Sequence, residues 1–461
     1  MGKSMPIYER KEGQEQPYWP VGPFKVRLPF VHYRWEKAEF LQALIMFVVS
    51  LGMIPLLTEY LGLPYQVALA YVVIGGIGFM LPTLLGVAMV PGWITPAIPV
   101  VLLFLGNFEP GPQAIQALFA LQFIVFAIFF IMGITKLGGR LVELVPNSLK
   151  AGILVGAGLA ALMGEIQHGG RLMNTPISLI IGSLIAFYIL FSLSFKQLVE
   201  KHKLAKSIAD YGLVPAMIIA MVIGWMVSEY PLANVEWGIT KPDFIGMWSY
   251  LPFAVGFPGY EIFLMAVPTA IIAYIIAFGD IIVGKTLLQR ADAKRKDELI
   301  DTNVNRVHLV TSIRNLIHAF FAPYPGLAGP LWTPVQATVV ERYMHGRKAM
   351  DSIHSGIGTF WIAGFIALFI LPLVSLFQPV LPIALSLTLI ITAYVCISVG
   401  VEQVHTTTER GVAGIMAVVL AIHGATYGLI AGIILYFLIE KTSLFKAKQK
   451  EEVSEKEDKA S

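Results

Sequence analysis

Charged residues and cysteines are both scarce in this chain of 461 residues. Asp, Glu, Lys and Arg make up 14% of the sequence, whereas a soluble globular domain carries roughly 25%. The single cysteine, Cys396, excludes an intramolecular disulfide and a cysteine-based metal cluster. Hydrophobic residues reach 56%. This composition excludes an ordinary water-soluble domain and indicates a polytopic membrane protein.

Sequence motifs for metal-dependent and nucleotide-dependent chemistry are also missing. The sequence contains no HExxH zinc motif and no GxxxxGK[ST] phosphate loop. We therefore expect no catalytic residues, no metal and no cofactor. The small net charge of +3 reflects orientation in a membrane, so we expect no nucleic-acid partner. A membrane-embedded enzyme is the alternative from another functional class, and activity of the purified protein without compartments would favour it.

Apolar runs, divided by Pro, Gly and charged residues, predict an all-α protein with about fourteen membrane crossings, since a helix needs roughly 20 residues to cross a bilayer. The predicted spans are 38–62, 65–85, 86–106, 113–134, 142–164, 175–195, 210–229, 262–286, 306–322, 325–343, 351–373, 375–398, 408–424 and 426–440.

The distribution of Lys and Arg predicts the orientation of these spans. With the N-terminus in the cytoplasm, only Arg171 and Lys241 remain on the outside, as the positive-inside rule requires. The first 37 residues also lack the pattern of a secretory signal. We expect a multi-pass protein of the cell membrane, surrounded by the lipid bilayer, with both termini cytoplasmic. The basic residues placed inside lie at 136–140, 196–206, 290–306, 342–348 and 410.

The predicted spans fall into two halves of seven. A polar stretch at 230–261 separates residues 38–229 from residues 262–440. Because seven is odd, the two halves enter the membrane in opposite orientations and form an inverted repeat. We expect 1–37 to be a cytoplasmic N-terminal tail, 230–261 an extracytoplasmic linker, and 441–461 a disordered cytoplasmic tail, because that end has almost no apolar residues.

Two spans at corresponding positions of the halves, the third and the tenth, are interrupted by Pro and Gly. The third contains residues 91–96, Pro-Gly-Trp-Ile-Thr-Pro, and the tenth contains Pro-Gly at 325–326 and Pro-Leu-Trp-Thr-Pro at 330–334. Since proline cannot continue a helix, each segment should be part extended strand and part half-helix. Such backbone is tolerated in a membrane only where it is buried in protein or lines a cavity. The alternative is that Pro and Gly are simply common in membrane helices.

Two half-helix N-termini that meet near the membrane midplane predict a site for an anionic or electron-rich solute. Trp93 and Trp332 would bracket a planar solute by stacking. Thr95 and Thr333 would exchange hydrogen bonds with the solute, and Gln336 would read a polar edge. Packing is the alternative role for each of these residues taken singly.

Asp280 lies inside the eighth predicted span. A carboxylate in an apolar span is costly and usually serves a substrate, ion or proton path, so we expect Asp280 to bind substrate and to act as the coupling residue. The alternatives are a salt bridge to Lys285 or solvation at the cytoplasmic mouth. In the ninth span, we expect Arg314, Asn315 and His318 to pair with loop carboxylates or lipid headgroups rather than to take part in transport.

Three short motifs resemble one superfamily of transporters. Val145-Pro-Asn-Ser-Leu-Lys150, followed by spaced glycines, resembles the fifth helix of the AzgA-like purine permeases, and Gly346-Arg347-Lys348 is similar to a Gly-Gly-Arg turn of the same proteins. Phe278-Gly279-Asp280-Ile281 looks like the Gly-Asp segment of the wider nucleobase-ascorbate (nucleobase:cation symporter) superfamily. The sulfate permeases share the fold of that superfamily.

The resemblance implies a seven-plus-seven inverted repeat divided into a core domain and a gate domain. The solute would lie between helices three, eight and ten, and two copies would form a homodimer through their gate domains. In the family, a carboxylate usually precedes the Gly-Asp aspartate by one turn, and a polar pair occupies the tenth helix. This sequence has Ile276 at the first position, and Pro330 to Thr333 represent the pair.

We therefore expect a secondary active transporter, coupled to H⁺ or Na⁺ as a symporter, for a small planar polar solute. By resemblance the solute is nucleobase-like, such as a purine, xanthine or uracil. The alternative within transport is an anion transporter of the sulfate permease type. Two features favour that alternative: the paired half-helix N-termini, and the loss of the polar residues that read a purine.

Overall fold

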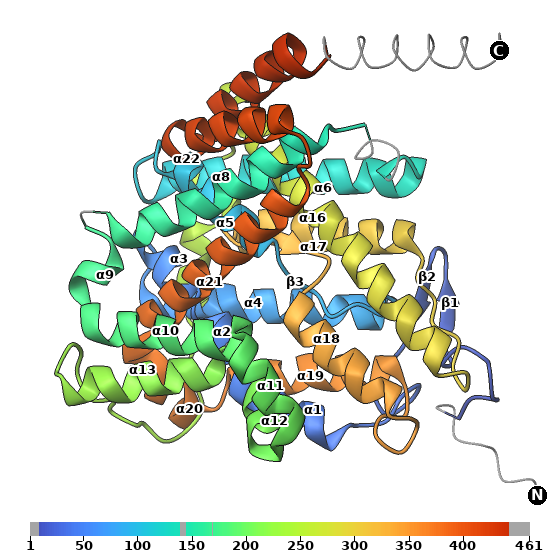
Figure 1. Cartoon of the computed structure of the whole chain (residues 1–461). Coiled ribbons are helices and arrows are strands. Elements are labelled where there is room, and N and C mark those ends of the chain that lie inside the picture. The colour runs from blue at the N-terminus through green and yellow to red at the C-terminus, as the bar shows by residue number, and fades with distance from the viewer. Residues whose placement is uncertain (1–8, 139–143, 168, 442–461) are drawn as a thin grey trace, which may run out of the picture.

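The computed structural model describes residues 9–138, 144–167 and 169–441, so the expected C-terminal tail lies outside the described residues. Among the described residues, seven helices are long and apolar enough to cross a membrane, or eight if one bent pair counts as a single span. Figure 1 shows their packing. The prediction of an all-α polytopic fold is confirmed, with two short strand pairs as local exceptions.

The first half of the chain follows the predicted spans. The first span is divided into α1 (Lys37–Met46), α2 (Val48–Leu51) and α3 (Ile54–Leu61), and the second is α4 (Tyr65–Leu84). The third consists of β3 (Gly92–Trp93), η1 (Thr95–Ala97) and α5 (Ile98–Leu105). The remaining elements are α6 (Pro112–Thr135), α8 (Asn147–Ile166), α9 (Arg171–Asn174), α10 (Pro176–Phe191), α11 (Leu193–Lys201), α12 (Lys203–Asp210) and α13 (Val214–Met226).

The second half begins with the long helix α16 (Tyr260–Lys294), which is followed by α17 (Val304–Phe321). The tenth span consists of β4 (Ala328–Gly329) and α18 (Thr333–Met344). The last two predicted spans form one element, α22, which is kinked at Gly424. The remaining elements are α19 (Ile353–Ala367), α20 (Leu371–Phe377), η3 (Gln378–Val380), α21 (Leu381–Glu402), α22 (Thr407–Leu435) and η4 (Tyr436–Glu440).

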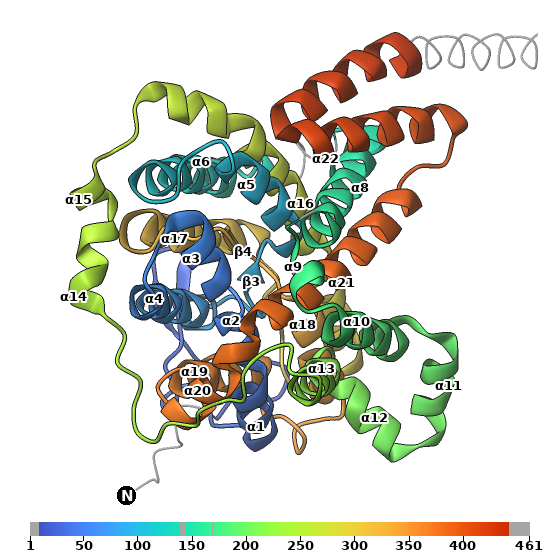
Figure 2. The same ribbon diagram turned by 90° about the vertical axis from the view of Figure 1, so that its left-hand side faces the viewer.

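The helices pack as two groups that correspond to a core domain and a gate domain. In the core domain, α17 and α16 pack against α6, and α19 packs against α1 and α4. In the gate domain, α8 packs against α21 and α22, and α10 packs against α13 and α21. Figure 2 shows the two groups side by side, with β3 and β4 deep inside the molecule. We assign α1–α6 and α16–α19 to the core domain and α8–α13 and α20–α22 to the gate domain.

Bends and ends of several helices have local causes in the sequence. Gly424 has φ of 84°, a left-handed conformation that glycine adopts without a steric penalty, and it divides α22 at the predicted boundary between the last two spans. Ser192 caps α11 by accepting a hydrogen bond from Phe195 N, where α10 turns by 61° into α11. Thr406 and Glu409 form a capping box at the start of α22.

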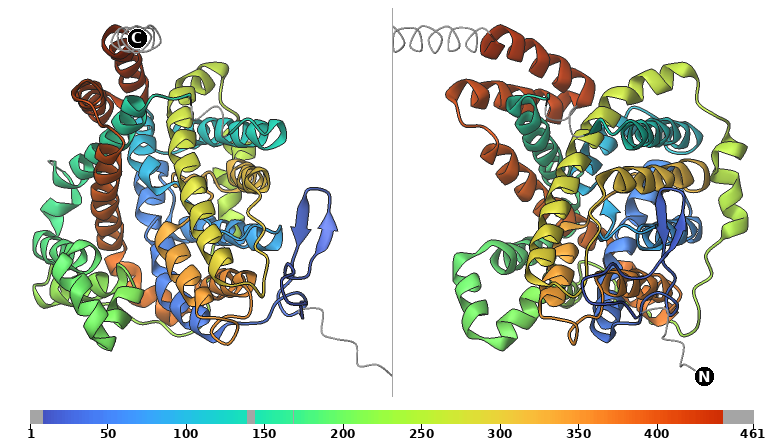
Figure 3. Two further views of the ribbon diagram at one scale, coloured as in Figure 1. Left: turned by 45° about the vertical axis from the view of Figure 1, so that its right-hand side comes forward. Right: turned by 90° about the vertical axis from the view of Figure 1, so that its right-hand side faces the viewer.

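The segment before α1 is folded rather than extended away from the helices. It forms the antiparallel ribbon of β1 (Trp19–Val21) and β2 (Phe24–Val26), and ion pairs join it to the loop after α16. Arg10 Nη2 lies 2.5 Å from Asp297 Oδ2, and Lys25 Nζ lies 2.5 Å from Asp301 Oδ2. The left panel of Figure 3 shows this ribbon at the edge of the molecule, outside the packed helices. The N-terminal segment is thus part of the core domain's surface, although the sequence predicts a tail.

The predicted linker at 230–261 contains three short helical elements: α14 (Phe244–Met247), η2 (Trp248–Tyr250) and α15 (Pro252–Val255). It is tied to the core domain, because Tyr71 Oη donates to Tyr250 O at 2.8 Å and Gln116 Nε2 donates to Val255 O at 2.9 Å. Thr240 also donates from N to Phe369 O. The linker therefore covers the core domain on its way from α13 to α16 (Figure 2).

Candidate functional site

The two broken spans meet as a short antiparallel ribbon in the middle of the molecule. Gly92 pairs with Gly329, and Trp93 pairs with Ala328. Beyond the ribbon, Ile94 N donates to Gly326 O at 3.0 Å, and Trp332 N donates to Val90 O at 2.7 Å. The prediction of part strand and part half-helix in both spans is confirmed. The exposed backbone of one broken span is satisfied largely by the other.

The two glycines of the ribbon allow the strands to approach closely. A Cβ atom added to Gly92 would lie 2.8 Å from Leu331 O, and one added to Gly329 would lie 2.8 Å from Trp93 C. Both obstacles are backbone atoms, so no side-chain movement would relieve the clash. A larger residue at either position would push the two half-helices apart.

Arg314 and Asn315 of α17 hold the ribbon from the core side. Arg314 is fully buried and donates from Nη1 to Gly329 O at 2.5 Å and from Nη2 to Gly92 O at 3.1 Å. Asn315 accepts from Ala328 N and donates to Ala328 O, at 3.0 and 2.9 Å. The expectation that these residues pair with loop carboxylates or headgroups is wrong, because both side chains bind backbone at the centre of the protein.

His318, one turn after Arg314 on α17, is also buried. Its Nδ1 lies 3.3 Å from Ala322 O, and its ring meets the edge of Trp93 at a centroid distance of 5.3 Å. His318 therefore packs behind the ribbon, away from the loops and headgroups that we expected it to contact. The sequence does show three polar residues inside one apolar span. The local pattern does not reveal that Arg314 and Asn315 bind the backbone of residues 92 and 328–329.

Both half-helices begin at a Thr-Pro pair close to the ribbon. The helical turn η1 starts at Thr95, and α18 starts at Thr333. No side chain caps either start, so the first amide groups lack the usual side-chain acceptor. Thr333 is exposed and Thr95 is half-buried, and Thr95 Oγ1 makes only a long 3.5 Å bond to Trp93 O. These uncapped starts are suited to an anionic or electron-rich group.

Asp280 lies on α16, which packs against both η1 and α18. One turn further along, Gly284 contacts the broken spans, because a Cβ added there would meet Met89 and Leu331. Asp280 also lies within electrostatic range of Cys396 on the gate helix α21. Within the described part of the chain, the Asp280 carboxylate has no hydrogen bond or ion pair, so the alternative of a salt bridge to Lys285 does not hold. Asp280 is half-buried, between core and gate.

Trp93 and Trp332 are not arranged as a bracket around an open gap. Trp93 stacks on Tyr324 at a centroid distance of 4.3 Å and meets the edge of Phe79 at 4.6 Å. Phe79 in turn stacks on Trp361 at 4.1 Å, and Trp361 lies 5.9 Å from Trp332. Two other rings therefore stand between the tryptophans. The row of five rings supports the ribbon by packing, which was the alternative role for each Trp.

Gln336 is used within the protein. It is fully buried, and its Oε1 accepts from Val90 N at 2.6 Å while its Nε2 donates to Ala88 O at 3.5 Å. The side-chain amide therefore satisfies the non-helical backbone just before β3. Because both ends of the amide are occupied, we do not retain Gln336 as a reader of the solute's polar edge.

The two half-helices differ in how they are covered. In the third span, η1 and α5 pack against the gate helices α8, α21 and α22, and no residue of α5 is exposed. In the tenth span, α18 packs mainly against the core helices α16 and α19. An exposed stripe follows α18 through Thr333, Ala337 and Glu341. The ribbon is therefore closed by the gate domain on the α5 side and open on the α18 side.

The chain is similar to one family of known proteins and to two solved structures. The model of a permease family, named Xan_ur_permease, matches residues 40–329. No curated protein matches the sequence. Among solved structures, the transmembrane domain of a cyanobacterium bicarbonate transporter, BicA, is similar with a TM-score of 0.49 and 16% identity, covering 86% of this chain and 97% of BicA. SLC26A9 is similar with a TM-score of 0.50 and 14% identity, covering 87% of this chain and 64% of SLC26A9.

Proposed function

Because this chain belongs to the permease family, the nucleobase-ascorbate transporters, we propose that it carries a small planar polar solute of the nucleobase class, driven by a proton or sodium gradient. The resemblance seen in the short sequence motifs is thereby confirmed at the level of the family. A match over residues 40–329 includes the third, fourth, eighth and ninth spans and reaches β4. Transport is the family's activity, and the solute and the coupling ion are our proposal.

One observation carries this proposal: two uncapped half-helix starts meet at the β3–β4 ribbon, and α16, the helix that carries the unpaired Asp280, packs against both of them. The half-helix starts at Thr95 and Thr333 supply positive dipole ends that no side chain caps. Asp280 supplies an acceptor that no described side chain occupies. A nucleobase has carbonyl groups for such helix starts and N–H groups for such a carboxylate, so the site offers both kinds of partner.

Asp280 is the proposed coupling residue. A carboxylate without a basic partner, held between core and gate, changes the charge of the site when it takes up a proton or binds a cation. In the proposed cycle, the core domain moves relative to the gate domain, so that the ribbon faces each side of the membrane in turn. The present arrangement, with α5 covered and the α18 stripe exposed, corresponds to access from the cytoplasmic side, if the termini are cytoplasmic as predicted.

A small inorganic anion is the second candidate, and two observations favour it. Gln336 is not free to read a base, and the buried Arg314 places a positive charge directly behind the ribbon. In the described residues, no Asp or Glu pairs with Arg314. A positive charge beside two half-helix N-termini attracts an anion more strongly than a neutral solute.

A thermal-shift screen of the purified protein separates the two candidates. Xanthine, hypoxanthine and uracil form one arm, sulfate and bicarbonate form the other, and each is tested at two pH values. A solute that binds the folded state raises the melting temperature. Stabilisation by a nucleobase, with competition by nucleobases in uptake by proteoliposomes, supports the proposal. Stabilisation and competition by anions alone would assign the second candidate instead.

A further inference from the structure

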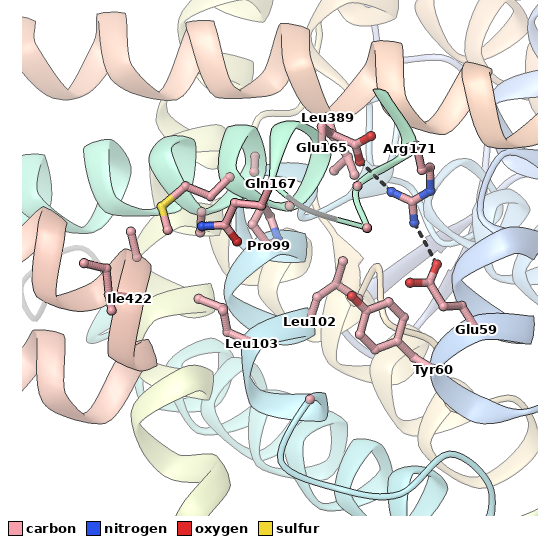
Figure 4. Close-up of a pocket in the computed structure, with 18 of the residues that line it drawn as sticks. Glu59, Tyr60, Pro99, Leu102, Leu103, Glu165, Gln167, Arg171, Leu389 and Ile422 are labelled. Atoms are coloured by element: carbon pink, nitrogen blue, oxygen red, sulfur yellow. Dashed lines mark hydrogen bonds and ion pairs between the residues drawn. The ribbon is translucent and has the colours of Figure 1, made fainter. Parts of the chain in front are cut away.

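A cavity of about 500 Å³ lies between the core and gate domains, on the side where α5 leads away from the ribbon. Figure 4 shows its lining. Its lining includes Pro99 and Leu103 of α5 and Ala161 of α8. Pro99 is four residues after Thr95, which is about 6 Å along a helix. The cavity therefore leads from the surface to within about one helical turn of the proposed solute site.

An ion triad of Glu165, Arg171 and Glu59 lines one side of this cavity (Figure 4). Arg171 Nη1 lies 2.5 Å from Glu165 Oε1, and Arg171 Nη2 lies 2.9 Å from Glu59 Oε2. Glu165 and Arg171 belong to α8 and α9 of the gate domain, whereas Glu59 belongs to α3 of the core domain. One guanidinium thus ties the two domains together.

The local sequence fixes Arg171 to the gate side of this triad. Gly169 has φ of 85° and turns the chain back after α8, and a Cβ on Gly170 would lie 2.3 Å from Glu165 O. The Glu165 side chain is buried, whereas Glu59 is 56% exposed. Arg171 and Glu165 therefore move together, and the bond to Glu59 is the one that must break if the two domains separate on this side.

We propose that Arg171 and Glu59 form a latch that holds the α5 side of the transporter shut while the α18 side is open. The proposal rests on the proposed function, because it assumes that the core and gate domains move relative to each other. Breaking the latch shifts the population toward the state in which the α5 side is open and the α18 side is covered. An ion pair that is half exposed sets only a modest bias.

Glu59 offers a clean way to break the latch. Glu59→Gln removes the ion pair between the domains. Arg171 stays paired with the buried Glu165, so the positive charge of Arg171 remains balanced. Glu59→Lys adds repulsion against Arg171. Glu109→Gln is the matched control, because Glu109 is an exposed carboxylate in the loop after α5 and has no ion pair in the described structure.

Two reporter cysteines read the two sides separately, in a Cys396→Ser background that removes the single native cysteine. Ala161→Cys reports the cavity, since Ala161 is 3% exposed and lines it. Ala337→Cys reports the exposed stripe of α18. The measurement is the rate of maleimide labelling of purified protein in nanodiscs, where both faces are accessible, so neither solute nor gradient is needed.

With Glu59→Gln, labelling of Ala161→Cys should become about two- to fivefold faster, as expected for losing a partly exposed ion pair. Labelling of Ala337→Cys should become slower by a smaller factor, set by the population that the state with the open α18 side loses. Glu59→Lys should change both rates further in the same directions, and Glu109→Gln should change neither. Faster labelling at Ala161→Cys alone would indicate local loosening and overturn the proposal, as would unchanged rates in Glu59→Lys. Neither of these two results would contradict the solute assignment, which the thermal-shift screen tests separately.

Discussion

The third and tenth spans have the same design but different surroundings. Each enters the ribbon as a two-residue strand, passes a Thr-Pro pair and continues as a half-helix. The half-helix of the third span is sandwiched between core and gate, whereas that of the tenth has an exposed stripe. The inverted repeat thus supplies two equivalent half-helix starts at one ribbon, and the gate domain covers only the half-helix of the third span.

The largest effect should come from Asp280 on α16, the helix that packs against both η1 and α18. Asp280→Asn keeps the shape of the side chain but cannot take up a proton or balance a cation, so gradient-driven accumulation of the solute should be abolished. Folding should be unaffected, because Asp280 makes no bond that the amide would break. The measurement is uptake into proteoliposomes with an imposed gradient, alongside the melting temperature.

Glu341→Gln is the control for this substitution, since Glu341 is an exposed carboxylate on the open stripe of α18. It should leave accumulation intact. Full accumulation by Asp280→Asn would remove Asp280 from the coupling mechanism.

Arg314 joins the two spans, so its removal should weaken both together. Arg314→Met fills a similar volume but leaves Gly92 O and Gly329 O without these donors. The cost should be about 1–3 kcal/mol of folding free energy, with a clear loss of transport. Arg290→Met, at an exposed position of α16, is the control and should melt like the native protein. An Arg314→Met variant of native stability and uptake would contradict a role in holding the ribbon.

The closeness of the two strands can be tested at Gly329. Gly329→Ala would bring a Cβ to 2.8 Å from Trp93 C, and relief requires the strands to separate, at a cost of about 1–3 kcal/mol. Gly364→Ala in α19 is the matched control, because an added Cβ there meets nothing within 4 Å. Melting temperatures should fall for Gly329→Ala and stay level or rise for Gly364→Ala. Equal melting temperatures of the two variants would mean that the two strands can separate without a loss of stability.

The sequence predicts the positions of the spans and both breaks, because proline and glycine act locally. It does not predict what the freed backbone binds. Arg314 reaches Gly92 across 222 positions in the chain, and Gln336 reaches Val90 across 246. Trp93 and Trp332 are recognisable as neighbours of the breaks, but only the fold shows that Phe79 and Trp361 stand between them. Residue types therefore identify where a special site forms, and long-range packing decides which side chains remain free for a solute.

The sequence does not predict that the N-terminal segment is folded, for the same reason. Its composition is that of a polar tail, yet Arg10 pairs with Asp297, which lies 287 positions away. Lys25 and Arg306 both bind Asp301. Charged residues near a terminus look solvated in the sequence, and only their partners in later loops show that they are part of the folded core domain.

The smallest effect should be a loosening of this N-terminal segment in acid. Burial opposes ionisation of Asp297 and Asp301, but hydrogen bonds from Arg295 to Asp297 and from Lys25 to Asp301 lower the pKa of both carboxyls below the ordinary value. Groups with a lowered pKa stabilise the folded form above that ordinary value, about pH 4, and the contribution is lost as the pH falls through the lowered pKa. Burial raises the pKa of Glu298 instead, so Glu298 does not add to this loss.

Hydrogen exchange of residues 19–26, corrected for intrinsic rates, measures the loosening between pH 7 and pH 3. Exchange should become faster in acid, whereas the buried strands β3 and β4 should remain protected. Asp301→Asn should already loosen the segment at pH 7 and reduce the further change in acid. Protection that is independent of pH in both proteins would show that the ion pairs do not hold the segment.

Protection of a cysteine at the open half-helix tests most directly whether the solute binds at the ribbon. Thr333→Cys, in the Cys396→Ser background, places a thiol at the exposed start of α18, and Glu341→Cys places one on the same stripe about 12 Å further along. The solute that stabilises the protein in the thermal-shift screen should slow maleimide labelling of Thr333→Cys and leave Glu341→Cys unchanged. Equal labelling of Thr333→Cys with and without that solute, at saturating concentration, would contradict the proposed site.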